Sequence, residues 1–215
     1  TPLTTMIAQP EFLQLRDNNN ALFFGCDQDW FRSFWQRKAG CGSCTGANIL
    51  HYFMRRGQLR LPIDINSQDD FVRLMEHSWR YLTPGVMGLH IPARMKEGLD
   101  RMLQELGCPR RSLLLEIPDR VEERPAVDTV EAFIREGLAS DSPLAFLNLH
   151  NGDIPQLEGW HWVTVVGLTG SGDSAVMEIY DNGNHLKVSL AQWLGSARRG
   201  GGFVYVGQAE LCNVE

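Results

Sequence analysis

Apolar residues recur at intervals of three and four residues in several segments of the first two-thirds of the chain. This spacing places the apolar side chains on one face of a helix and predicts that face to be buried. Capping residues, early prolines and closing glycines mark the ends of these predicted helices. The four segments are 47–57, 66–82, 91–107 and 127–138.

The pattern changes after residue 142, where short runs rich in β-branched and aromatic residues are separated by Gly, Asn, Asp and Ser. That spacing is typical of antiparallel strands. Helices followed by strands predict an α+β fold rather than an alternating βαβ fold. We expect one domain over residues 1–215, with a helical part at about 36–140 packed on a β-rich part at about 143–208. The runs are PLAFLNLH, HWVTVVGL, AVMEIYD, HLKVSL and GGFVYVG, and SLLLEIP at 112–118 is a further short strand.

The start of the chain is expected to be irregular, and a site is expected between the helices and the sheet. The first 40 residues, which include RDNNNALFFG, show little periodicity and are predicted to be loop with one short strand. The space between a helical half and a sheet is the usual place for a site. We therefore expect an active-site cleft there.

Composition and charge exclude several classes of function. The chain has 215 residues and a net charge of −6, which argues against a surface that tracks nucleic-acid phosphates. It contains no apolar run long enough to span a bilayer. Five cysteines are too few and too scattered for a disulfide scaffold, which favours a soluble protein in a reducing, cytoplasmic setting. No cofactor motif is found, because GLTGSGDS at 167–174 lacks the lysine of a phosphate-binding loop.

The stretch AGCGSCTGANIL carries the candidate chemistry. Cys41 and Cys44 lie among glycines at the start of a predicted helix, where the helix dipole stabilises a thiolate. A structural interpretation, in which both sulfurs are simply packed, is also open. A zinc site lacks a second compact ligand pair, since Cys108 and Cys212 are isolated, so no metal is expected. A C-x-x-C redox pair lacks the surrounding βαβ unit.

A cysteine nucleophile needs a base and a group that orients the base. EGWHWVTVVGL places His161 at the start of a predicted strand, and the following strand, in MEIYDNGNHL, ends at Asp181. Neighbouring antiparallel strands bring these two residues to the same end of the sheet. Asn182 and Asn184 are alternatives to Asp181, and all three are also ordinary turn residues.

This order of a cysteine at a helix start, a histidine on a strand and an acid on the next strand resembles the papain-like cysteine peptidase superfamily. CGSC itself resembles the papain signature, in which the second cysteine is the nucleophile, and that alignment names Cys44. QRKAGCGSCTGANIL, together with HWVTVVG, is also similar to the bacteriocin-processing (double-glycine) peptidases. That alignment names Cys41 and gives Gln36 the role of the oxyanion glutamine. We prefer it, because Lys38 rather than glutamine stands six residues before Cys44.

The resemblance covers roughly residues 36–56 and 144–206. It implies a soluble, bacterial-type thiol hydrolase or peptidase that uses Cys41, His161 and Asp181 on a peptide, isopeptide or acyl substrate, without a cofactor. The alternatives are an acyltransferase with the same triad, an inactive peptide-binding module, and a C-x-x-C thiol–disulfide oxidoreductase. A reversible disulfide between Cys41 and Cys44 that switches activity off is a further hypothesis. The sequence leaves the oligomeric state open.

Overall fold

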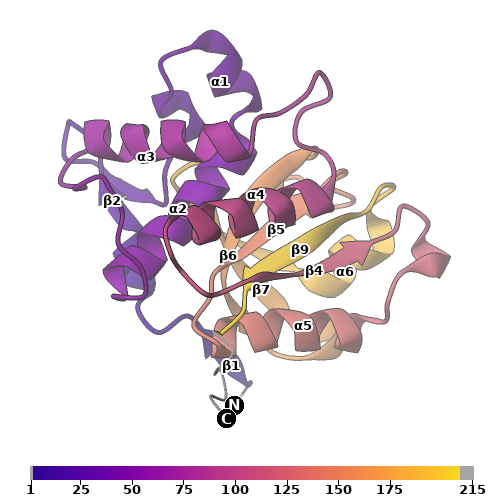
Figure 1. Ribbon diagram of the computed structural model, residues 1–215. Helices are drawn as coiled ribbons and strands as arrows, with labels where there is room; N and C mark the ends of the chain where they lie inside the picture. Colours follow the sequence, from indigo (N-terminus) through magenta and orange to yellow (C-terminus); the bar gives the residue numbers. More distant parts are fainter. Residues whose placement is uncertain (1, 209–215) are drawn as a thin grey trace.

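The fold is a seven-stranded antiparallel sheet with helices on both faces, seen in a computed structural model that describes residues 2–208 (Figure 1). The strands lie in the order β4-β9-β5-β6-β7-β8, and β1 pairs with the second half of β6. The strands of this sheet are β1 (Thr4–Met6), β4 (Ser112–Ile117), β5 (Leu144–Asn148), β6 (His161–Thr169), β7 (Val176–Asp181), β8 (Asn184–Ser189) and β9 (Gly201–Val206). The α+β prediction is therefore confirmed.

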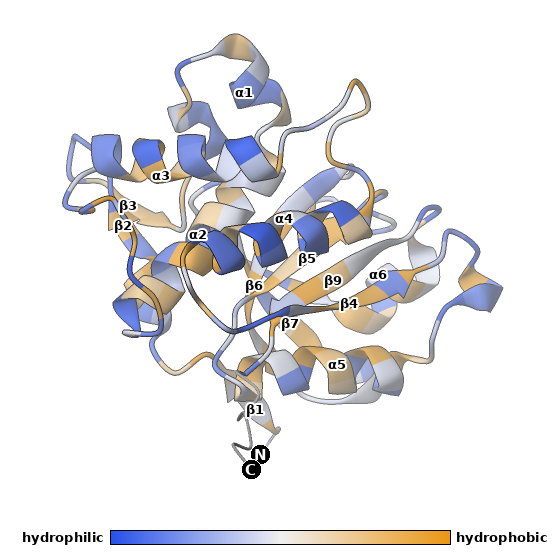
Figure 2. Ribbon diagram, viewed as in Figure 1, coloured by the Kyte–Doolittle hydropathy of each residue, from blue (hydrophilic) through white to orange (hydrophobic). Residues whose placement is uncertain are grey.

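The helices are α1 (Phe34–Ala39), α2 (Cys41–Arg55), α3 (Gln68–Tyr81), α4 (Pro92–Glu105), α5 (Val127–Ala139) and α6 (Leu190–Ser196). Four of them, α2 to α5, cover the segments whose apolar spacing predicted them, with α2 beginning earlier than predicted, whereas α1 and α6 were not predicted. The outward faces of α3 and α4 are hydrophilic, as the amphipathic pattern requires (Figure 2). None of the described helices has both the length and the apolar character needed to cross a membrane.

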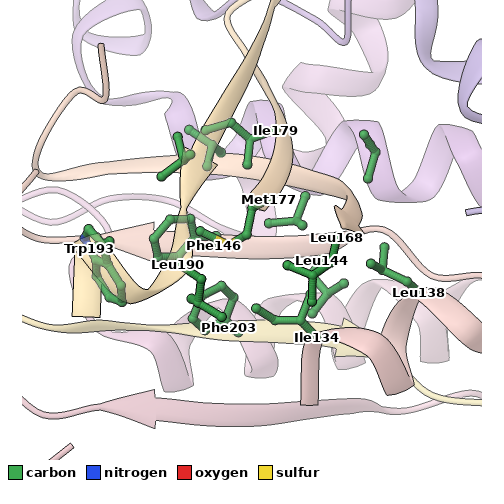
Figure 3. Close-up of a cluster of buried hydrophobic side chains, with 14 of the residues drawn as sticks. Ile134, Leu138, Leu144, Phe146, Leu168, Met177, Ile179, Leu190, Trp193 and Phe203 are labelled. Carbon is green, nitrogen blue, oxygen red and sulfur yellow. The ribbon is translucent and has the colours of Figure 1, made fainter. Parts of the chain in front are cut away.

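The sheet separates two hydrophobic cores, because alternate residues of a strand point to opposite faces. In β5, Leu144 and Phe146 pack with α5 and α6, whereas Ala145 and Leu147 pack with α2, α3 and α4. Figure 3 shows the first core, where the rings of Phe146, Phe203 and Trp193 meet. The strand is buried along its whole length, which explains the apolar run from Leu144 to Leu147 that precedes Asn148.

The N-terminal segment differs from the prediction. Instead of loop with one short strand, it forms β1, a separate hairpin of β2 (Gln14–Arg16) and β3 (Leu22–Phe24), and α1. Each of these strands has three residues, too few to show a period of two. The main sheet thus takes β1 and β4 from the first two-thirds of the chain as well as the five strands that follow residue 142.

Gly40 permits the junction between α1 and α2 that brings Cys41 to its place. A Cβ atom at this position would lie 2.3 Å from the carbonyl oxygen of Gln36 and 2.5 Å from Cε2 of Phe31. Because the first contact is with backbone, no side-chain rotation relieves it. The next residue, Cys41, therefore begins a second helix directly behind a turn that only glycine fits.

We expect Gly40→Ala to lower the free energy of unfolding by about 1–3 kcal/mol, the usual cost of overpacking a filled space. Urea denaturation of the purified protein measures this change. The matched control is Gly195→Ala in α6, where nothing lies within 4 Å of the added Cβ. The control is expected to be neutral or to gain up to about 1 kcal/mol. Equal stabilities for the two variants would contradict the role given to Gly40.

Candidate active site

Cys41 is the first residue of α2 and is half-buried, whereas the residues that follow it, Gly42 to Phe53, are buried. At this end of the helix, Cys41 is therefore the residue that reaches the surface. The backbone N–H groups at a helix start have no partner within the helix, and the dipole there favours negative charge. Cys41 thus places a partly accessible sulfur at the N-terminal end of a helix.

His161 lies between the carboxylate of Asp181 and the side chain of Cys41. It begins β6 and Asp181 ends β7, and these strands are antiparallel neighbours, so both side chains reach the same end of the sheet. Nε2 of His161 is 2.6 Å from Oδ1 of Asp181. The side chain of Cys41 also lies close enough to the ring to affect its charge. Because Nε2 is bound to Asp181, Nδ1 is the ring nitrogen left for the sulfur.

The surroundings of His161 favour its charged form. Burial, the largest single effect, lowers the pKa of His161, but the hydrogen bond to Asp181 and the neighbouring Cys41 outweigh it. The pKa therefore lies well above its ordinary value. A charged imidazole next to a partly accessible sulfur is the arrangement that a cysteine nucleophile requires.

Glu158 is a second acidic group near the imidazole. Its Oε2 lies 3.8 Å from Nε2 of His161, and the carboxylate is largely exposed. One nitrogen and two carboxylate oxygens, from His161, Asp181 and Glu158, lie within 4.8 Å of one another, which is the spacing of a metal site. A metal ion there would need Nε2 deprotonated and would replace its hydrogen bond to Asp181, so the two uses of this nitrogen exclude each other.

Among the described residues, the side-chain amide of Gln36 forms no hydrogen bond with Cys41. Its Nε2 donates to Oε2 of Glu76 in α3, at 2.7 Å. This bond fixes α1 to α3. The role of oxyanion donor therefore stays a prediction, and the geometry of Gln36 does not favour it.

Cys44 forms a disulfide with Cys26, whose Cα lies 6.1 Å from its own. It therefore offers no thiol in this structure, either as the alternative nucleophile or as a disulfide partner for Cys41. Cys41 and the buried Cys108 are the free cysteines of the described residues, and Cys212 lies outside them. Disulfides persist mainly in oxidising compartments, so this bond does not favour the reducing setting that the cysteine count indicated.

Asn182 and Gly183 form the two-residue turn that follows Asp181. Their φ angles are 45° and 84°, and Asp181 pairs with Asn184 across the turn, as in a type I′ hairpin. The side chain of Asn182 faces Gln28: its Oδ1 accepts from the Gln28 backbone at 3.1 Å, and its Nδ2 donates to Oε1 of Gln28 at 3.2 Å. Asn182 thus holds the turn, and the structure gives Asp181 the contact with His161.

Gln28 is a residue of the site region that the sequence analysis missed. Besides its contacts with Asn182, it donates from Nε2 to the carbonyl oxygen of Arg37 at 2.7 Å. It therefore connects the turn after Asp181 to α1, three residues before Gly40. No motif marks Gln28, because its partners are far away in sequence.

The loop of residues 83–91 stands next to the site and is held by the two tryptophans that flank His161. Nε1 of Trp160 donates to the carbonyl oxygen of Met87 at 2.7 Å, and Nε1 of Trp162 donates to that of Leu89 at 2.6 Å. Beside Cys41, the loop borders a pocket of about 360 Å³. The pocket is lined by Trp35, Lys38, Ala39, Cys41, Val86, Met87, Gly88, Leu89 and Trp160.

Comparison of the sequence with protein-family models gives no match, and comparison with curated proteins gives none either. The functional interpretation therefore depends on the chemistry of the site itself.

Proposed function

We propose that this protein is a cysteine-dependent hydrolase that attacks a peptide, isopeptide or other acyl carbonyl with Cys41. The observation that carries the proposal is the position of His161, which is buried, bound through Nε2 to Asp181 at 2.6 Å and adjacent to Cys41. An inert packed cysteine has no need of a buried charged pair, which is expensive to keep. The papain-like arrangement, with helices on one side of the site and the sheet on the other, is part of this proposal.

The proposed reaction runs in two steps. The Cys41 thiolate attacks the carbonyl carbon, and the imidazolium of His161 gives its proton to the leaving group as the acyl-enzyme forms. Water then attacks the acyl-enzyme, His161 takes a proton from that water, and the sulfur leaves. The carboxylate of Asp181 holds the ring in place and stabilises its positive charge throughout.

The negative charge on the carbonyl oxygen needs donors during each attack. The unpaired backbone N–H groups in the first turn of α2 are the donors nearest to Cys41 along the chain. Each such donor is typically worth about 2.7–4 kcal/mol of transition-state stabilisation. An acyltransferase would use the same groups, with an amine in place of water.

The disulfide between Cys26 and Cys44 bears on the redox alternative. A C-x-x-C oxidoreductase cycles between a dithiol and a disulfide of its own two cysteines. Since Cys44 is bonded to a cysteine outside the motif, that cycle has no partner for Cys41. The hydrolase remains the function that the contacts of Cys41 favour.

The proposal is tested by alkylating the folded protein with iodoacetamide and locating the label by mass spectrometry. At about pH 6, where an ordinary thiol carries little thiolate, we expect Cys41 to react at least about tenfold faster than N-acetylcysteine. The ion pair with His161 is the reason, so His161→Ala is expected to remove this advantage. If Cys41 reacts no faster than N-acetylcysteine, with or without His161, the proposed function is contradicted.

A further inference from the structure

The pocket beside Cys41 is apolar and open. Of the large hydrophobic side chains that the structure leaves exposed, Trp35 (48%), Val86 (96%) and Met87 (57%) all line it. Val86 and Met87 lie on the loop of residues 83–91, and Trp35 lies on α1. Soluble proteins seldom gather exposed apolar groups around one hollow unless something binds there. Cys41 lines the same pocket. A group bound in the pocket would therefore lie next to the carbonyl that Cys41 attacks in the proposed reaction.

Hydrogen bonds hold the loop of residues 83–91, the apolar wall of the pocket, in place before any ligand binds. Both tryptophan N–H groups anchor the loop, and the backbone N–H of Gly88 donates to the carbonyl oxygen of Gly85 at 3.0 Å. Gly42 lets the loop approach α2, because a Cβ there would lie 2.7 Å from Cδ2 of Leu89. A preformed wall loses little entropy when a ligand binds, which is what a specificity pocket requires.

The charges that border the pocket are mainly positive. Lys38 lines it, Arg94 lines a second hollow that shares residues 86–89 with it, and the guanidinium of Arg199 lies 4.9 Å from the ring centre of Trp160. Arg199 is partly neutralised by Asp119, at 3.5 Å. Glu158 is the nearby acidic group, and it faces Nε2 of His161. In a chain with a net charge of −6, a basic border around one hollow is a local exception.

We infer that this pocket binds a large apolar side chain of a peptide substrate beside the reacting carbonyl, and that its basic border favours an acidic neighbour over a basic one. The inference rests on the proposed function of Cys41. Burial of a large apolar group next to the reacting bond discriminates between substrates. A charge at the edge of the pocket adds to this discrimination, because it changes the rate of encounter and the orientation of the substrate.

The test uses peptidyl acyloxymethyl ketones of one length that differ in the residue beside the electrophilic carbonyl. The rate of Cys41 modification by each probe is divided by the rate with iodoacetamide on the same protein, which removes differences in sulfur reactivity. We expect the phenylalanine probe to react at least about tenfold faster than the glycine probe. We also expect a phenylalanine probe with a glutamate neighbour to react several-fold faster than one with a lysine neighbour, about as much as one exposed charge contributes.

Two pairs of variants locate the preference. Val86→Ser is expected to lower the ratio of phenylalanine to glycine rates, while Val121→Ser, an exposed apolar residue outside the pocket, keeps it. Lys38→Glu is expected to reverse the preference between glutamate and lysine neighbours, while Arg111→Glu, which lines a different hollow, keeps it. Val86 is almost fully exposed, so its replacement is not expected to unfold the protein.

The two possible failures are distinguishable. A protein whose Cys41 reacts rapidly with iodoacetamide but treats the phenylalanine and glycine probes alike would overturn the pocket inference and leave the proposed function standing. A Cys41 that resists iodoacetamide and every peptide probe would overturn both. A preference that Val86→Ser and Lys38→Glu leave untouched would also overturn the assignment to this pocket.

Discussion

Replacing Cys41 with alanine is expected to abolish the turnover of activated acyl esters such as p-nitrophenyl acetate. The sulfur is the atom that forms the acyl-enzyme in the proposed mechanism, and no other free thiol is accessible among the described residues. Loss of a nucleophile that acts together with a base typically lowers the rate by a factor of about 10⁴ or more. Release of p-nitrophenol in the steady state, and the initial burst that reports acylation, measure the effect.

Cys108→Ala is the matched control. Cys108 is the other free cysteine of the described residues, and it is buried. Its replacement removes a thiol without touching the site, so the turnover of the ester should stay within about twofold of wild type for a substitution this small. A Cys41→Ala protein with wild-type turnover would place the chemistry elsewhere in the molecule. Folding of both variants is checked by circular dichroism.

The three candidate side chains could be located from sequence because each lies at the end of an element with a strong local pattern. Cys41 begins a helix of small and apolar residues, His161 begins the longest strand, and Asp181 precedes an Asn-Gly turn. Local patterns fix the ends of such elements, and antiparallel pairing of adjacent strands then brings two of the ends together. The structure places all three in one site.

The contacts of the other two candidate residues could not be predicted in this way. Gln36 was assigned from its spacing to Cys41, but its partner Glu76 is 40 positions away on α3. Cys44 was interpreted with the cysteine three positions before it, whereas its bond is to Cys26. Both partners depend on how segments pack in space, and neither helix periodicity nor motif spacing carries that information.

The loop of residues 83–91 shows the same limit. Gly and Pro break its pattern, so the sequence indicates only an irregular connection. Its position is set by hydrogen bonds from Trp160 and Trp162 to backbone carbonyl groups 73 positions earlier in the chain. The pocket beside Cys41 exists because of these bonds. Sequence alone therefore predicted that Cys41, His161 and Asp181 lie close together, but not the pocket beside Cys41.

Replacing Asp181 with asparagine is expected to lower the pKa of His161 and to slow ester turnover by about 10²-fold, the lower end of what a correctly placed general acid and base contributes. Burial alone lowers the pKa of His161, and the hydrogen bond that its Nε2 donates to Asp181 is the largest of the effects that raise it. Asparagine keeps the shape of the side chain but removes the negative charge. The charged imidazole then loses its main support while the cost of burying it remains.

A lower pKa of His161 moves the pH dependence of activity towards acid. In the wild type, whose pKa at His161 is raised, the imidazolium persists to high pH and is lost only as the pH rises through that value. In Asp181→Asn the imidazolium is lost at lower pH. The alkaline limb of the pH dependence of kcat/KM, which reports the free enzyme, should therefore shift towards acid.

Two further variants separate charge from structure in this prediction. Glu158→Gln removes an exposed carboxylate 3.8 Å from Nε2 of His161, so it should shift the alkaline limb in the same direction by a smaller amount. Asn184→Ala changes the residue that pairs with Asp181 across the hairpin and has no side-chain contact with His161 among the described hydrogen bonds, so it should leave the limb in place. If Asp181→Asn and Asn184→Ala gave the same profile, the carboxylate would not control the charge of the imidazole.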